Sequence, residues 1–167
     1  MKIVLKIFRN FLKILYKYKF TRNCYSFIEP LYVNGLSSAT KKTRLGKNVH
    51  FNGISIVGCG SVSIGDNFHS GINCQIITEN HNYEGRKIPY DETYICMDVF
   101  IENNVWIGNN VIILGGVTIG EGAIIQAGST VVSDIPKYAI AGGHPARAFS
   151  KRDEIHYEEL VSKKLFF

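Results

Sequence analysis

A β-branched aliphatic residue recurs every six positions through the central part of the chain. Six residues fit neither the 3.6-residue turn of a helix nor a two-residue alternation, but they fit a short strand followed by a corner, repeated along a solenoid. The repeated residues are Ile101, Ile107, Ile113, Ile119, Ile125 and Val131. We therefore predict an all-β solenoid in which these six side chains stack inside the coils.

The other positions of the six-residue units agree with this geometry. The fifth position is apolar or small, which suits a second inward side chain, and glycines allow tight backbone angles at the corners. The fifth positions are Val105, Val111, Val117, Ala123, Ser129 and Ile135. The corner glycines are Gly108, Gly115, Gly116, Gly120, Gly122 and Gly128. Each unit is thus predicted to form one side of a coil.

The repeat continues upstream in two phases that are offset by one residue. The inward residues of these phases are Leu45, Phe51 and Val57, then Ile64, Ser70 and Ile76. The offset predicts a bulge or a wider corner near Ser63. The phase breaks again before Ile101, where turn-forming and polar residues predict an excursion loop over 82–98. We divide the chain into a basic helical segment (1–44), the solenoid with its loop (45–136) and a tail that ends in a short helix (137–167).

Basic residues are concentrated near the N-terminus. Residues 1–47 contain eleven Lys or Arg and one acid, Glu29, whereas residues 48–167 contain eight basic and thirteen acidic residues. This basic segment carries no nucleic-acid-binding motif, so we expect no nucleic-acid partner. The four cysteines lack a CxxC spacing, so we expect buried, reduced thiols in a reducing compartment. They are Cys24, Cys59, Cys74 and Cys96.

Residues 1–20 predict a basic amphipathic helix. Cations recur every three or four residues, which places them on one helical face and excludes a transmembrane span or a secretory signal. The basic residues are Lys2, Lys6, Arg9, Lys13 and Lys17; the opposite face carries Val4, Ile7, Phe8, Phe11, Leu12 and Leu15. The apolar face either packs on the solenoid end or a neighbouring subunit, or lies on an anionic membrane. We favour the first, because an open solenoid needs a cap.

Residues 103–147, NNVWIGNNVIILGGVTIGEGAIIQAGSTVVSDIPKYAIAGGHPAR, resemble the hexapeptide-repeat acyltransferases. The likeness is greatest to the maltose, galactoside and polysaccharide O-acetyltransferase branch and extends over about 45–152. The matching pieces are NVWIG, GVTIG, AGS, DIP and the closing GxPAR at 143–147. The resemblance implies a left-handed parallel β-helix of triangular section, with three hexads per coil.

The same resemblance implies the activity and the partners. It implies a homotrimer with acetyl-CoA bound between neighbouring subunits and no metal. The expected reaction is O-acetylation of a sugar, nucleotide-sugar or lipid-linked glycan, in surface polysaccharide synthesis, by a cytoplasmic protein that contacts the inner membrane face if residues 1–20 bind lipid. Alternatives are N-acetylation of an amino sugar, acetylation of an antibiotic, or a non-catalytic β-helix scaffold.

A histidine near neutral pH suits the base that such a reaction needs, because a neutral alcohol is a poor nucleophile. His81 ends the hexad IITENH at the root of the predicted loop, and the resemblance places the catalytic histidine there. Glu79, Glu84 or a backbone carbonyl are the candidates to orient its ring. The resemblance also assigns the oxyanion donor to the backbone amide of Asn109.

The remaining predicted site residues surround the acceptor and the CoA. Asn73, Glu79 and Tyr83 are the candidates for the acceptor, although Asn73 also suits a corner with a left-handed backbone. The predicted CoA-binding residues are Trp106, Gly108, Ala127, Gly128, Arg147, Lys151 and Arg152. The chain departs from the pattern of this branch at Val132-Ser133 and at Ser150. We therefore expect Lys151 or Arg152 to contact the CoA phosphates instead.

A zinc-dependent carbonic anhydrase on the same fold is the other enzyme class that we considered. Its metal needs three histidines, two of them closely spaced on one strand. The histidines of the solenoid, His50, His69 and His81, are far apart in sequence. A non-catalytic scaffold, in turn, needs neither the excursion loop nor the GxPAR tail. The sequence therefore favours the acetyltransferase.

Overall fold

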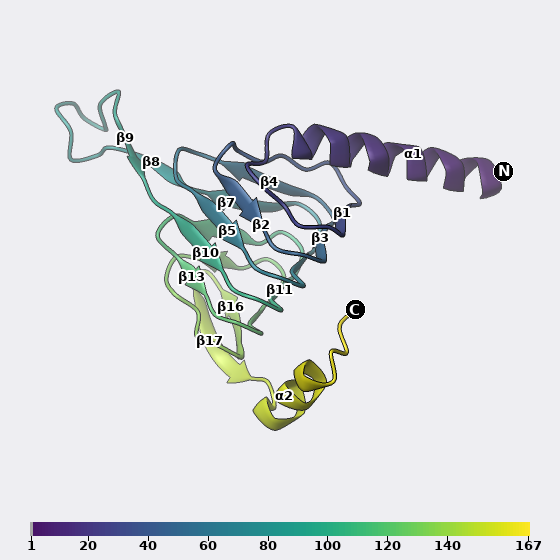
Figure 1. Cartoon of the computed structure of the whole chain (residues 1–167). Coiled ribbons are helices and arrows are strands. Elements are labelled where there is room, and N and C mark those ends of the chain that lie inside the picture. Colours follow the sequence, from purple (N-terminus) through teal and green to yellow (C-terminus); the bar gives the residue numbers. More distant parts are fainter. Residues whose placement is uncertain (1) are drawn as a thin grey trace.

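The structure is a computed structural model that describes residues 2–167. Met1 and the side chain of Lys2 lie outside the described part, and with them the predicted place of Lys2 on the basic helix face. Stacked coils form a solenoid with one helix at each end (Figure 1). The helices are α1 (Lys2–Thr21) and α2 (Glu154–Ser162).

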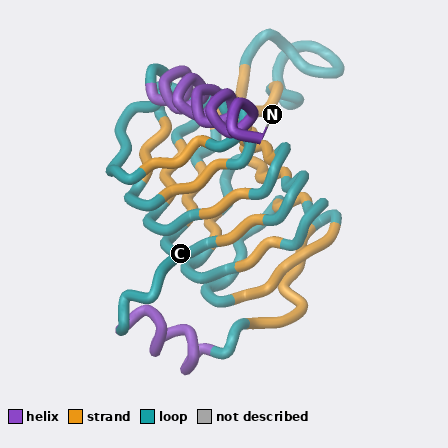
Figure 2. The backbone as a smooth tube through the Cα atoms, turned by 90° about the vertical axis from the view of Figure 1, so that its right-hand side faces the viewer, coloured by secondary structure: helices purple, strands orange, loops and turns teal. Residues whose placement is uncertain are grey.

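Three sheets form the sides of the solenoid, and within each of them the coil strands pair in parallel (Figure 2). The first sheet contains, in spatial order, β1 (Leu31–Val33), β3 (Val49–Phe51), β6 (His69–Ser70), β11 (Trp106–Ile107), β14 (Ile124–Ile125), β16 (Ala139–Gly143) and β17 (Ala146–Lys151). The second contains β13 (Thr118–Ile119), β10 (Val99–Ile101), β5 (Val62–Ile64) and β2 (Thr43–Leu45). The third contains β15 (Thr130–Val131), β12 (Ile112–Leu114), β7 (Cys74–Ile77) and β4 (Ile54–Val57).

The strand register confirms three hexads per coil. Ile101 pairs with Ile119 and Ile107 pairs with Ile125, in each case one coil of three hexads later. All six repeated aliphatics and all six fifth-position residues are buried. Burial of each large aliphatic side chain stabilises the fold by roughly 1.5–3 kcal/mol, so the stacked interior is the main source of stability.

The upstream part of the solenoid differs from the sequence prediction in two places. The first coil begins at β1, where Leu31 pairs with Val49, before the boundary placed at residue 45. The inward assignment of Val57 is wrong: alternation along β4 turns Ile54 and Ile56 inward and leaves Val57 exposed. Of the two alternatives predicted near Ser63, the wider corner is confirmed: β5 pairs in regular register and the extra residue lies in the corner 58–61.

The excursion loop leaves the third side of the solenoid as a two-stranded ribbon, visible at one corner of the molecule (Figure 1). Its strands are β8 (Glu79–His81) and β9 (Tyr94–Cys96), which pair antiparallel. A disulfide joins Cys96 at the base of this ribbon to Cys59 in the neighbouring coil, with the Cα atoms 5.3 Å apart. The prediction of four reduced cysteines is therefore wrong for this pair and holds for the buried thiols of Cys24 and Cys74.

Helix α1 contacts the first coil through its C-terminal end only. Phe20 is fully buried, and its ring lies 5.1 Å from that of Phe51. Capping of the solenoid predicted that Phe8, Phe11 and Leu15 are buried, which is wrong: their side chains are exposed. The N-terminal half of α1 extends past the first coil (Figure 1). The cap is thus the last turn of the helix.

The C-terminal tail covers the other end. Strands β16 and β17 form an antiparallel hairpin that extends the first sheet, and α2 follows after Asp153, whose carboxylate caps it by accepting from the amide of His156. The sequence predicted the short helix but not the hairpin.

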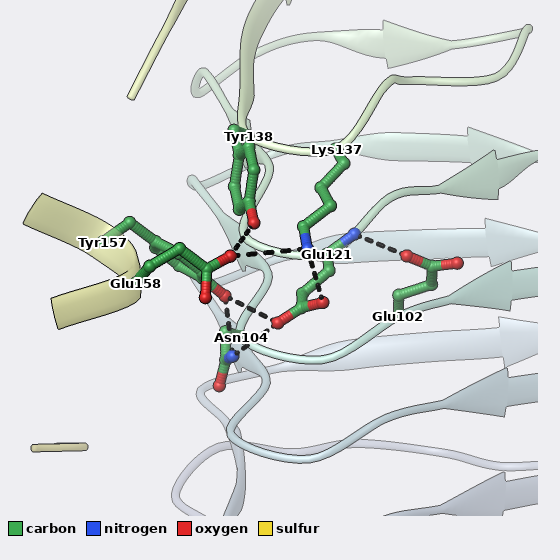
Figure 3. Close-up of polar contacts among 7 residues, drawn as sticks. All are labelled: Glu102, Asn104, Glu121, Lys137, Tyr138, Tyr157 and Glu158. Carbon is green, nitrogen blue, oxygen red and sulfur yellow. Dashed lines mark hydrogen bonds and ion pairs between the residues drawn. The ribbon is translucent and has the colours of Figure 1, made fainter. Parts of the chain in front are cut away.

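A polar network holds α2 against the coils (Figure 3). The hydroxyl of Tyr157 accepts from Asn104 Nδ2 at 2.7 Å and donates to Glu121 Oε1 at 3.2 Å. Lys137 Nζ lies 3.3 Å from Glu121 and 3.6 Å from Glu158. Burial raises the pKa of Tyr157 to about 12, so its hydroxyl stays protonated and keeps both bonds. The network fixes the tail beside the outer face of the first sheet.

Candidate active site

A groove on the outer face of the first sheet brings together four of the predicted site residues. Trp106, Gly108, Asn109 and Ala127 line one cavity of about 440 Å³. The other side chains of the groove are apolar apart from Gln126, and they include Phe149 of β17. Mostly apolar walls with a few polar groups are typical of small-molecule sites. Three of the seven predicted CoA-binding residues, Trp106, Gly108 and Ala127, thus lie on one concave surface together with Asn109.

Asn109 presents its backbone amide in this groove. The side-chain Oδ1 accepts from the Ile72 amide at 3.0 Å and the carbonyl accepts from the Gly128 amide at 2.8 Å, which fixes the residue between two coils. Among residues 2–167, no hydrogen bond from the Asn109 amide to an acceptor is formed. A Cβ at Gly71 would lie 2.5 Å from that amide nitrogen, so only glycine fits there. The arrangement suits a donor held ready for an oxyanion.

Gly128 borders the groove with a left-handed backbone. Its φ is +74°, and a Cβ built on it would meet no atom within 4 Å. The space beside this corner is therefore open, and the backbone angle rather than a protein neighbour favours glycine here. Such a corner permits close approach of an extended ligand to the main chain.

His81 lies at the end of β8, at the root of the ribbon as predicted. Its ring stacks on that of Tyr90 with centroids 3.8 Å apart and is tilted by 35° against that of Tyr94, with centroids 4.8 Å apart. Within the described chain its buried Nδ1 has no hydrogen-bond partner, so none of the proposed partners, Glu79, Glu84 or a backbone carbonyl, orients the ring here. Aromatic contacts alone hold the imidazole, and the two tyrosines were not predicted as part of the site.

The predicted acceptor residues occupy two places. Glu79 shares β8 with His81 and lies two residues before it, hence on the same face of the strand, whereas Tyr83 is exposed in the loop. Asn73 sits at a corner with φ of 56° and donates to Asn110 Oδ1 at 2.9 Å, which confirms the alternative that we gave for it. It also lines a separate cavity of about 410 Å³ that contains Ser55.

The three basic residues of the tail differ in their surroundings. Arg147 is exposed and its guanidinium donates to the Ser133 hydroxyl at 3.3 Å. Lys151 is exposed and pairs with Glu154 at 2.8 Å. Arg152 is half-buried and donates to the Gly122 carbonyl at 2.6 Å; burial lowers the pKa of its guanidinium. Arg147 and Lys151 are thus accessible to an anionic ligand, while Arg152 holds a corner of the solenoid.

A ladder of asparagines at one solenoid corner was missed in the sequence. The side chain of Asn48 donates to Asn67 at 3.0 Å and Asn67 donates to Asn104 at 2.8 Å. All three have φ near +55° to +60°, which asparagine tolerates better than most residues. The available signal was an asparagine three positions before the inward residue of a hexad, as before Phe51, Ser70 and Ile107, spaced by whole coils.

His50 of β3 and His69 of β6 form a stacked pair on the outer face of the first sheet. Their rings stack with centroids 4.1 Å apart, between Tyr32 and the C-terminal Phe167. Desolvation, with a smaller effect of neighbouring His69, lowers the pKa of His50 to about 4, and desolvation lowers that of His69. Both rings are therefore neutral at pH 7. No group of three or more His, Cys, Asp or Glu side chains in residues 2–167 is arranged to hold a metal ion.

The structure separates His81 from the groove. Of the cavities described above, the groove of about 440 Å³ contains Asn109 and Ala127 but not His81, and the cavity beside Asn73 does not contain it either. One chain therefore supplies the histidine and the groove on different sides of the solenoid.

Comparison with known proteins gives the family resemblance. Residues 98–133 match the family model described as bacterial transferase hexapeptide (six repeats). Galactoside O-acetyltransferase of Escherichia coli (strain K12) is 37% identical over 117 residues, which are 68% of this chain and 57% of the relative. This chain thus spans little more than half the length of that curated relative.

Two solved structures have the same architecture. A maltose O-acetyltransferase from Clostridium difficile 630 superposes with a TM-score of 0.62 at 29% identity, over 77% of this chain and 67% of the other. A galactoside acetyltransferase in complex with coenzyme A gives 0.63 at 29% identity, over 81% and 63%. These matches confirm the predicted resemblance to hexapeptide-repeat acyltransferases and the left-handed parallel β-helix.

Proposed function

We propose that this hexapeptide-repeat protein is an acetyl-CoA-dependent acetyltransferase that acetylates a hydroxyl of a sugar or glycan. The observation that carries the proposal is the groove in which Trp106, Gly108, Asn109 and Ala127 meet beside an open glycine corner. An extended pantetheine arm fits such a surface because it needs apolar walls and exposed main-chain groups. The coenzyme A complex of the similar galactoside acetyltransferase supports this assignment.

In the proposed reaction, His81 takes the proton of the acceptor hydroxyl as its oxygen attacks the thioester carbonyl. The resulting oxyanion accepts a hydrogen bond from the Asn109 amide. When the tetrahedral intermediate collapses, the C–S bond breaks and the CoA thiolate takes the proton back from the imidazolium. Stacking on Tyr90 restricts the histidine ring while it exchanges this proton.

A homotrimer with shared sites accounts for the distance between His81 and the groove. The groove is open toward solvent on one side, and its missing wall would come from a neighbouring subunit whose ribbon brings His81 to the thioester. Arg147 and Lys151 are the accessible cations for the CoA phosphates. We place the reaction in the cytoplasm, in surface polysaccharide synthesis, with a sugar, nucleotide-sugar or lipid-linked glycan as acceptor.

The test is incubation with labelled acetyl-CoA and a panel of free sugars, UDP-sugars, lipid-linked oligosaccharides and amino sugars. The proposal expects label in at least one glycan, as an ester that mild base removes. Label in a base-stable amide would move the acceptor class to an amine. Failure to bind coenzyme A or to label any acceptor would contradict the proposal and favour a non-catalytic scaffold.

A further inference from the structure

The outward face of α1 is apolar and has no partner in the described chain. Tyr16 and Phe20, on one side of the helix, contact the first coil. The opposite side is exposed, with Phe8 at 58%, Phe11 at 54% and Ile14 at 65%. The face continues through Val4, Ile7, Leu15 and Tyr18. An exposed apolar face of this length marks an interaction surface rather than scattered surface residues.

The charges of this helix are all of one sign. Residues 2–21 contain six Lys or Arg and no acid, and the acid of the N-terminal segment, Glu29, already pairs with Lys17 at 2.8 Å. A helix is about 10–12 Å across, so cations on its flanks and far side lie within roughly one Debye length of a surface that touches its apolar face. A partner that complements this helix therefore presents an apolar layer with negative charge at its edge.

A basic recess continues the surface at the C-terminal end of α1. Lys19, Arg22 and Lys41 line a cavity of about 480 Å³, together with Asn23 and Tyr18. Tyr18 belongs to the exposed apolar face as well, so the recess and that face are contiguous. Three cations around an open recess suit the phosphate of a lipid headgroup.

We propose that α1 docks this protein on an anionic membrane surface, with its apolar face between the acyl chains and headgroups and the recess of Lys19, Arg22 and Lys41 around headgroup phosphates. A second copy of the chain is the less suitable occupant, because pairing two such helices brings twelve cations together, of which only the two Lys17 side chains are paired with an acid. In residues 2–167 no helix has the length and apolar character needed to cross a bilayer, so the contact is with the surface.

The experiment is co-sedimentation of the full chain with vesicles of phosphatidylcholine alone and of phosphatidylcholine mixed with phosphatidylglycerol, at low and high salt. We expect binding to the mixed vesicles at low salt, with little binding to neutral vesicles and a loss of affinity as salt rises. The Phe8→Ser/Phe11→Ser variant should bind at least about tenfold more weakly, since it removes two large apolar groups. Both positions are exposed, so the fold is retained.

Matched controls lie at the other end of the solenoid. Ile155→Ser removes an apolar side chain that is 85% exposed on α2, and it should leave vesicle binding unchanged. Lys6→Glu on α1 and Lys164→Glu near the C-terminus change the net charge equally, and only the first should weaken binding.

Equal vesicle binding by the wild type and by the Phe8/Phe11 variant, or binding that does not depend on lipid charge, would overturn the proposal. Oligomers that dissociate in the Phe8/Phe11 variant, without vesicle binding by the wild type, would assign the face to a second copy. Acetyl transfer is not a readout, so the result is independent of the proposed reaction.

Discussion

Acidification should destabilise this protein through the stacked pair of His50 and His69. The ordinary histidine pKa of 6.5 falls to about 4 at His50 because the ring is desolvated and faces a second histidine. Between these two values the unfolded chain binds a proton that the folded chain does not, so stability decreases as pH falls from about 6.5 toward 4. The full shift corresponds to about 3 kcal/mol, and partial exposure of the ring reduces the expected loss to about 1–2 kcal/mol.

Urea unfolding at a series of pH values and one protein concentration measures this loss. In His50→Gln the loss between pH 6.5 and 4 should be smaller than in wild type by about 1–2 kcal/mol, since the titrating group is absent. His156→Gln is the matched control, because it removes an exposed histidine from α2. Identical pH dependence of wild type and His50→Gln would refute the assignment of the pH effect to the stacked pair.

Three further predictions concern the ribbon, the tail and the base. Reduction of Cys59–Cys96, or Cys59→Ser, should lower the free energy of unfolding by about 2–4 kcal/mol, because the bond closes a long loop; complete alkylation of all four cysteines without reductant would show that the bond is absent. Tyr157→Phe should cost about 1–2 kcal/mol and increase amide exchange in α2, since Asn104 and Glu121 lose their shared partner; unchanged protection would contradict this role of the hydroxyl. His81→Ala should reduce kcat by roughly 10²–10⁴-fold with little change in the Kd of coenzyme A, and unaltered turnover would exclude His81 as the base.

The six-residue pattern predicted the interior because its constraint is local. An inward side chain in a parallel solenoid meets its equivalents one coil away, so every member of the run from Ile101 to Val131 faces the same requirement. The pattern failed at Val57, where a four-residue strand and a longer corner replaced the hexad. There, alternation within the strand decided which side chains turn inward.

Contacts between distant parts of the chain were not predictable in the same way. Cys59 and Cys96 meet because the ribbon leaves and re-enters the solenoid at the corner that stacks on the corner of Cys59, one coil later, and no spacing rule in the sequence predicts such a return. The groove residues were found through their motifs, whereas the stack of His81 on Tyr90 depends on the path of an irregular loop. The exposed apolar side of α1 depends on which end of the helix meets the first coil.

The central claim is that the active site joins the groove of one subunit to His81 of its neighbour, and mixed subunits test it most directly. His81→Ala subunits keep an intact groove, while Ala127→Leu subunits keep His81 and have a blocked groove; each variant alone should be inactive. After unfolding and joint refolding at equal amounts, random assembly places an intact groove beside an intact His81 in about one site in four, so about a quarter of the wild-type activity should return. Activity that stays at the level of the separate variants, although mixed trimers have formed, would contradict the shared site.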